Sequence, residues 1–164
     1  MSIGHSSLNG KTIHIDGTVQ GVGFRPAVWR FARENQLVGR VWNSGDGVVI
    51  QTWGEERSID HFLQQLRDNP PPLAFIEQIQ VEPLDGEPPE QFTIAGSVGG
   101  VVTTAITADA ASCPQCITEV MDPKNRRYCY PFTNCTHCGP RFSIIRAIPY
   151  DRNNTSMAPF TMCA

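Results

Sequence analysis

The sequence has 164 residues, 40% hydrophobic and 18% charged, and its 13 Lys and Arg against 16 Asp and Glu give a net charge of −3. This composition excludes a disordered chain, and the length suits one domain or a small pair. No run reaches the ~18 apolar residues of a membrane span, and residues 1–10 lack the apolar segment of a signal peptide. We therefore expect a cytoplasmic protein without a membrane partner.

The first half of the chain alternates strand and helix patterns. Residues 12–17 alternate polar and apolar side chains, which predicts a half-buried strand. A glycine-rich stretch follows, and then a helix that begins near Arg25 and ends at Gly39, with an apolar stripe between Val28 and Leu37.

Further elements follow in the same alternation. Residues 40–53 predict a hairpin around a Ser-Gly-Asp-Gly turn. A second helix over residues 55–68 ends before three consecutive prolines, and strands are expected at 75–82 and 91–94. The order βαββαβ is typical of the ferredoxin-like α+β fold, so we assign residues 10–98 to one such domain.

The second half is organised around cysteine rather than around an apolar core. All six cysteines lie between Cys113 and Cys163. In a chain without a secretion signal, such clustering indicates a metal site rather than disulfides. We therefore expect a linker at residues 99–108, a finger at residues 109–145, and a connector at residues 146–164 that includes the start of a second finger.

The segment from Gly17 to Pro26 joins the first strand to the first helix. Glycines at positions 21 and 23 free the backbone to point successive N–H groups at one anion, and Arg25 adds a guanidinium suited to phosphate oxygens. A dinucleotide fingerprint is excluded because Pro26 replaces its third glycine, and a P-loop because Gly-Lys-Ser/Thr is absent. The segment predicts phosphate binding, and a plain tight turn with a surface arginine is the alternative.

Four cysteines have the spacing of a structural zinc site. Cys113 and Cys116 are followed, after 18 intervening residues, by Cys135 and Cys138. Two such pairs close a tetrahedron of thiolates and leave no open position for catalysis. We expect zinc as a structural cofactor, with disulfides or free thiols as the alternative.

Three neighbouring residues need separate assignments. Cys129 lies between the pairs without a partner, and we expect an ordinary thiol. The regular spacing argues against His137 as a ligand. Cys163 suits the first ligand of a second, truncated finger.

Two segments resemble the signatures of the acylphosphatase family. Residues 19–25, Val-Gln-Gly-Val-Gly-Phe-Arg, resemble the first signature, and residues 39–48 resemble the second at the expected place after the helix. The resemblance covers about half of the chain. It implies that Arg25 and backbone amides hold a phosphoryl group while Asn43 orients the attacking water. The phosphate-binding residues that it implies are Gln20, Gly21, Val22, Gly23, Phe24 and Arg25.

The combination of this domain with a C-x2-C-x18-C-x2-C finger is similar to the N-terminal region of the [NiFe]-hydrogenase maturation carbamoyltransferases, the HypF family. Residues 122–128 and 139–144 also resemble that family's spacer and post-finger stretch. The resemblance implies hydrolysis of carbamoyl phosphate, a small-molecule acyl phosphate, in the first domain. It further implies ATP-dependent carbamoyl transfer by domains absent here, to a hydrogenase maturation partner with a C-terminal cysteine.

Two alternatives stay open at this point. One is a stand-alone acylphosphatase with an accessory finger. The other is a non-enzymatic zinc-binding interaction module that touches nucleic acid through Lys124, Arg126, Arg127 and Arg141. Nucleic acid is disfavoured because residues 99–164 carry only six basic and four acidic side chains, far from the dense basic surface that a phosphate backbone requires.

Overall fold

A computed structural model gives the structure of residues 8–98 and 104–161. Part of the expected linker, residues 99–103, and the expected second-finger ligand Cys163 lie outside these described residues. The first half contains β1 (Asn9–Thr18), α1 (Phe24–Glu34), β2 (Val38–Asn43), β3 (Gly47–Gly54), α2 (Glu56–Asp68), β4 (Phe75–Pro83) and β5 (Phe92–Ile94). The second half contains α3 (Pro114–Met121) and the 3-10 turn η1 (Arg152–Asn154).

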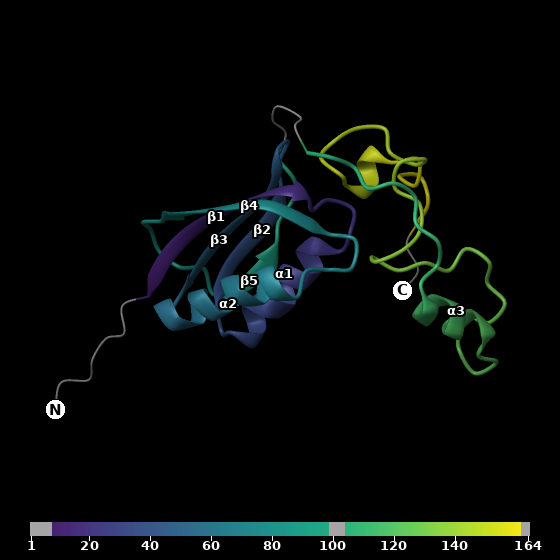
Figure 1. Cartoon of the computed structure of the whole chain (residues 1–164), viewed down its shortest axis with the longest axis horizontal. Coiled ribbons are helices and arrows are strands. Elements are labelled where there is room, and N and C mark those ends of the chain that lie inside the picture. Colours follow the sequence, from purple (N-terminus) through teal and green to yellow (C-terminus); the bar gives the residue numbers. More distant parts are fainter. Residues whose placement is uncertain (1–7, 99–103, 162–164) are drawn as a thin grey trace.

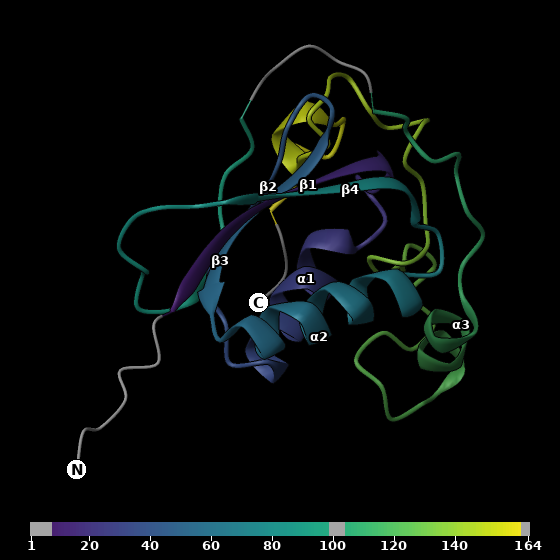
Figure 2. The same ribbon diagram turned by 60° about the vertical axis from the view of Figure 1, so that its left-hand side comes forward.

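The first seven elements form the expected ferredoxin-like α+β domain, in which α1 and α2 cover one face of a single sheet (Figures 1 and 2). The strand order is β4-β1-β3-β2-β5; β1 is antiparallel to β3 and β4, and β5 is parallel to β2. Asp16 pairs with Gly47, and Asn43 pairs with Val48. The C-terminal ends of β1 and β2 therefore lie at the same end of the sheet.

The core of this domain lies between the sheet and its two helices. The polar and apolar alternation of β1 buries Ile13 and Ile15, and the apolar stripes of the helices bury side chains such as Val28 and Phe62 against them. All 18 residues of the hydrophobic cluster lie between Ile13 and Phe92. The domain therefore carries its own apolar core.

The first helix is shorter than the sequence pattern predicts. It ends at Glu34, and Gln36 turns the chain with a φ of 57°. Gly39 lies within β2, so its assignment as the helix terminus is wrong. Leu37 is buried as expected, but it reaches the core from the turn. Its spacing continues the helical period although the helix has already ended.

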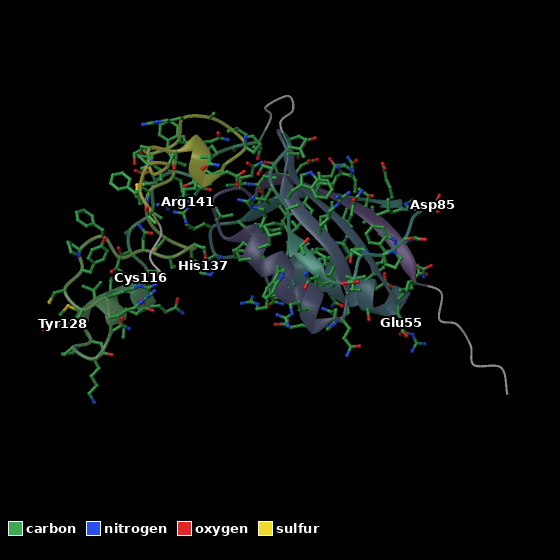
Figure 3. The ribbon with its side chains drawn as sticks, turned by 180° about the vertical axis from the view of Figure 1, so that it is seen from behind. Glu55, Asp85, Cys116, Tyr128, His137 and Arg141 are labelled. Atoms are coloured by element: carbon green, nitrogen blue, oxygen red, sulfur yellow. The ribbon has the colours of Figure 1, made fainter. Side chains whose placement is uncertain are left out.

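The second half lies against one end of the sheet domain, beyond the β1–α1 loop (Figures 1 and 3). The described part of the expected linker, residues 104–108, is fixed to that domain. Thr104 is buried and donates from Oγ1 to the Gly17 carbonyl at 3.0 Å, and Ile106 forms a parallel bridge with Gln20. Among the described residues, no helix is long and apolar enough to span a bilayer.

Candidate functional site

The β1–α1 loop forms a cradle of backbone N–H groups. Gly21 and Gly23 adopt left-handed conformations with φ of 73° and 78°, and Gly23 directly precedes α1. In the described part of the chain, the N–H groups of residues 22–25 donate to no protein acceptor. Unpaired amides at a helix N-terminus attract an anion. The local structure thus has the form expected of a phosphate site.

Arg25 and Asn43 point to one position in front of this cradle. Arg25 lies in the first turn of α1, and Asn43 is the last residue of β2. Arg25 Nη2 and Asn43 Nδ2 both donate to the Tyr150 carbonyl oxygen, at 3.3 and 3.1 Å. Asn43 is 1% exposed, and its Oδ1 is buried without a hydrogen-bond partner among the described residues. That oxygen can accept a hydrogen bond from a small molecule.

The Gln20 side chain holds the cradle in place. Its Nε2 donates to the carbonyls of Ser44 at 2.6 Å and Gly47 at 2.8 Å, and its Oε1 accepts from the Tyr150 N–H at 2.8 Å. Because both ends of the amide are occupied, only the backbone of Gln20 remains for an anion. One side chain therefore connects the β1–α1 loop to the β2–β3 turn and to the second half.

Part of the expected connector, which spans residues 146–164, covers the cradle. We call residues 148–152 the lid segment. Asp151 Oδ1 accepts from Arg25 Nη2 at 2.7 Å, and the two side chains are 29% and 21% exposed. The Tyr150 ring lies over Gly21, where an added Cβ would be 3.2 Å from it, and burial raises the pKa of the Tyr150 hydroxyl. No motif marks these residues in the sequence.

Arg141 joins the finger to the cradle and corrects one expectation. It is 2% exposed, and it donates to three carbonyl oxygens, those of Gly21, Thr136 and Gly139. Figure 3 shows it where the second half meets the sheet domain. The alternative in which Arg141 contacts nucleic acid is therefore wrong for this residue, because its guanidinium is buried and already hydrogen-bonded.

Asp109 orders the chain around Arg141. Its Oδ1 accepts from the N–H groups of Arg141 at 2.9 Å and Ser143 at 3.1 Å. Hydrogen bonds from the Ser143 side chain and backbone, and then from the Arg141 backbone, lower the pKa of Asp109 to about 2. The carboxylate is therefore ionised at neutral pH.

The cradle, the finger and the lid segment line one cavity of about 350 Å³. Its walls include Arg25 and Asn43 from the sheet domain, Thr136 from the finger, and Tyr150 from the lid segment. Gly23 is so close to the finger that an added Cβ would be 3.1 Å from Thr136. The candidate site is therefore shared by both halves of the chain.

The four expected cysteines form a cluster with the dimensions of a zinc site. All four Sγ atoms lie within 4.8 Å of one another. The Sγ–Sγ distances are 3.7 Å for Cys113–Cys135, 3.7 Å for Cys135–Cys138 and 3.6 Å for Cys138–Cys116. A tetrahedron with Zn–S bonds of ~2.3 Å has edges of ~3.8 Å. The donor set therefore fits zinc.

The surroundings of the cluster are those of a closed structural site. Cys116 and Cys138 are buried. The His137 N–H points to Cys135 Sγ, and the Cys135 N–H points to Cys138 Sγ, both at 3.4 Å. Such N–H groups stabilise thiolate charge. Cys129 is exposed, and it lies outside the cluster, as does the His137 ring.

Comparisons with known proteins find a matching family for each half of the chain. Residues 11–94 match the family described as Acylphosphatase, and residues 113–145 match the HypF finger. An acylphosphatase of Archaeoglobus fulgidus is 42% identical over 84 residues, which are 51% of this chain and 93% of that protein. The chain belongs to the acylphosphatase family, and residues 11–94 are its acylphosphatase domain.

The similarity to one kind of protein extends across both halves. Carbamoyltransferase HypF of Rhodobacter capsulatus is 48% identical over 152 residues, which are 92% of this chain and 20% of that protein. A crystal structure of full-length HypF in its phosphate- and nucleotide-bound form has a TM-score of 0.92 at 46% identity, covering 96% of this chain and 21% of that one. The chain thus corresponds to the acylphosphatase domain and zinc finger of HypF carbamoyltransferases and spans about a fifth of their length.

Proposed function

We propose that the cradle hydrolyses carbamoyl phosphate and that Arg25 and Asn43 are its catalytic residues. One observation carries the proposal: Arg25 and Asn43 converge on a single acceptor in front of four backbone amides that have no acceptor among the described residues. A phosphoryl group bound at the cradle receives charge-assisted hydrogen bonds from the guanidinium and from the amides. The developing charge on the phosphoryl oxygens is stabilised by groups that are already in place.

Asn43 positions the nucleophile, which is a water molecule. Its buried Oδ1, which has no partner among the described residues, accepts a hydrogen bond from a water molecule, while its Nδ2 is held by the Tyr150 carbonyl. That water attacks phosphorus, and the bond to the carbamate oxygen breaks. Carbamate leaves as an anion and needs no proton from an acid. The products are carbamate and inorganic phosphate.

The zinc finger has a structural part in this proposal. Zinc supplies the cross-link that holds residues 113–138 together, and the ligands we propose are Cys113, Cys116, Cys135 and Cys138. Residues next to the cluster line the cavity. We also place the protein in the cytoplasm, since four reduced thiols suit a reducing compartment.

The test is phosphate release from carbamoyl phosphate by the chain and by its Arg25→Ala and Asn43→Ala variants. Each substitution removes a preorganised contact to the reacting groups, so we expect a loss of at least ~100-fold in kcat/KM. Arg30→Ala is the matched control, because Arg30 lies on the same helix with its side chain 62% exposed. Unchanged rates in the Arg25 and Asn43 variants contradict the proposal.

For the whole protein, we propose that the carbamate formed here is used in a later carbamoyl transfer. The support is the similarity to HypF carbamoyltransferases, of which this chain covers about a fifth. The acceptor we propose is the C-terminal cysteine of a hydrogenase maturation partner. A full-length protein with Arg25→Ala is then expected to lose carbamoylation of that partner, which mass spectrometry of the partner detects.

A further inference from the structure

The Arg25 side chain is held by groups from two distant parts of the chain. Its Nη2 donates to Asp151 Oδ1 at 2.7 Å and to the Tyr150 carbonyl at 3.3 Å, and its Nη1 donates to Ser97 Oγ at 3.4 Å. The contact with Asp151 is the shortest of these three, and its acceptor is a carboxylate. Charge-assisted hydrogen bonds are about twice as strong as neutral ones. Asp151 is therefore the main restraint among these three partners.

Asp151 acts on the site from outside the cavity. Arg25 is one of the residues that line the cavity, whereas Asp151 is not. Asp151 therefore reaches a ligand in the cavity only through the guanidinium that it holds. This arrangement is that of a residue that orients a catalytic group without touching the substrate.

The ion pair leaves part of the guanidinium for a ligand. A guanidinium carries five N–H donors, and the contacts with Asp151, Tyr150 and Ser97 use three of them. Among the described residues, the Nε–H and the second Nη1–H of Arg25 have no acceptor. Asp151 therefore fixes the orientation of the group without taking every donor that a phosphoryl oxygen needs.

The segment that carries Asp151 is fixed on both sides of this residue. Before it, the Tyr150 N–H donates to Gln20 Oε1 at 2.8 Å. After it, the Asn154 N–H donates to the Asp151 carbonyl at 2.8 Å, and Asn154 Nδ2 donates to the Pro149 carbonyl at 2.7 Å. A carboxylate on an unanchored loop would follow the arginine, whereas one on an anchored loop restrains it.

We propose, on the basis of the function proposed above, that Asp151 is a positioning residue that holds the Arg25 guanidinium in the orientation the reacting phosphoryl group requires. An unrestrained arginine side chain samples many rotamers, and a small misplacement of a catalytic group slows a reaction strongly. The 84 residues matched in the Archaeoglobus fulgidus acylphosphatase are 93% of that protein. Too little of that protein remains for a counterpart of residues 104–161, so this contact belongs to the chain with both halves.

The first test measures kcat and KM for carbamoyl phosphate in the unsubstituted chain and in Asp151→Ala. We expect kcat to fall at least ~10-fold while KM changes by less than ~3-fold, because Arg25 keeps its donors but loses their orientation. Asp151→Asn keeps an oxygen acceptor for Nη2 and should lose less activity. Glu34→Ala is the matched control, because it removes the carboxylate from another arginine pair on α1, the exposed pair with Arg30. It should leave both constants unchanged.

A spectroscopic measurement separates this inference from the proposed hydrolysis. In the NMR spectrum of isotopically labelled protein, a restrained guanidinium gives separate Nη–H signals, whereas rapid rotation about its C–N bonds merges them. Arg25→Lys identifies the Arg25 signals by removing them. These signals should be separate in the unsubstituted chain and merged in Asp151→Ala. If they behave in this way but the chain releases no phosphate, the hydrolysis proposal fails and the restraint of Arg25 by Asp151 stands.

Two kinds of result overturn the inference. Arg25 signals that are already merged in the unsubstituted chain, or that stay separate in Asp151→Ala, show that the carboxylate does not restrain the guanidinium. An unchanged kcat in an active Asp151→Ala variant shows that the restraint is not needed, and a raised kcat/KM shows that the carboxylate competes with phosphate for Arg25. Tryptophan fluorescence establishes that each variant is folded, and Asp151→Asn decides the question if Asp151→Ala is not.

Discussion

The sheet domain and the finger region differ in what is buried. In the sheet domain, 18 hydrophobic residues between Ile13 and Phe92 form one cluster. In the described part of the second half, burial falls mainly on the thiols Cys116 and Cys138 and on polar side chains such as Arg141 and Thr155. The first region gains its stability from removing apolar surface from water, which amounts to ~25 cal/mol per Å². The described residues of the second half bury no comparable apolar surface, and large side chains such as Phe132 and Phe142 stay exposed.

The difference shows how a region without a core becomes ordered enough to form part of a site. Its shape depends on the four-cysteine cluster and on polar contacts to the neighbouring domain, chiefly those of Arg141 and the lid segment. Both kinds of contact are directional, so they fix positions more narrowly than apolar contacts do. The following predictions test this division, beginning with the largest expected effect.

Removal of zinc should unfold the finger and leave the sheet domain intact. Metal binding supplies on the order of 10 kcal/mol to a small finger at neutral pH, whereas the sheet domain has its own core. The three tryptophans, Trp29, Trp42 and Trp53, all lie in the sheet domain. After treatment with a strong chelator, tryptophan fluorescence should stay native while protease cleavage appears within residues 109–145.

Substitution of single cysteines provides the control for this result. Cys116→Ser should reproduce the effect of the chelator, because Cys116 is a buried member of the cluster. Cys129→Ser should not, since Cys129 is exposed and lies outside the cluster. A second half that resists protease equally with and without metal contradicts the division.

Arg141→Met should detach the finger from the cradle while zinc stays bound. The substitution leaves three carbonyl groups without their charged donor, at a cost on the order of 3 kcal/mol. We expect faster protease cleavage at residues 104–109 and a higher KM, because Arg141 contacts Gly21 of the cradle. Arg146→Met is the control, as Arg146 is exposed. Equal behaviour of the two variants argues against docking through Arg141.

Asp109→Asn should have the smallest effect, and that effect should not vary between neutral and mildly acidic pH. The folded pKa of Asp109, about 2, lies below its ordinary value of 3.8. Its contribution is therefore complete above the ordinary value and is lost as the pH falls toward 2. The melting temperature of the variant should be reduced equally at about pH 8 and about pH 5.5. Asp85→Asn, in the sheet domain, is the control. A melting-temperature decrease that grows or vanishes between these two pH values contradicts the lowered pKa of Asp109.

The sequence predicts the parts of this molecule that rest on local patterns. Period-two alternation locates β1, apolar stripes locate α1 and α2, and paired cysteines locate the four-cysteine cluster. The same reasoning misplaces the end of α1, because Leu37 keeps the helical spacing after the chain has turned at Gln36. The same reasoning also assigns Arg141 to the surface, because composition does not reveal which basic side chain is buried against carbonyl acceptors.

The contact between Asp151 and Arg25 could not be predicted from the sequence, for a different reason. The two residues are 126 positions apart, and the segment that carries Asp151 has neither a periodic pattern nor a motif. Its position follows from how the finger docks on the sheet domain. Contacts of this kind depend on the assembled tertiary structure and leave no local signal.

The two glycines of the cradle show how one residue type can satisfy two requirements at once. A left-handed backbone at Gly21 and Gly23 already excludes most side chains. The same missing Cβ leaves room for the Tyr150 ring above one glycine and for Thr136 beside the other. Docking therefore adds no constraint that the loop sequence did not already have, and an alanine at either position would disturb conformation and contact together. Sequence evidence for the docked arrangement must therefore come from the residues that face these glycines, Thr136 and Tyr150.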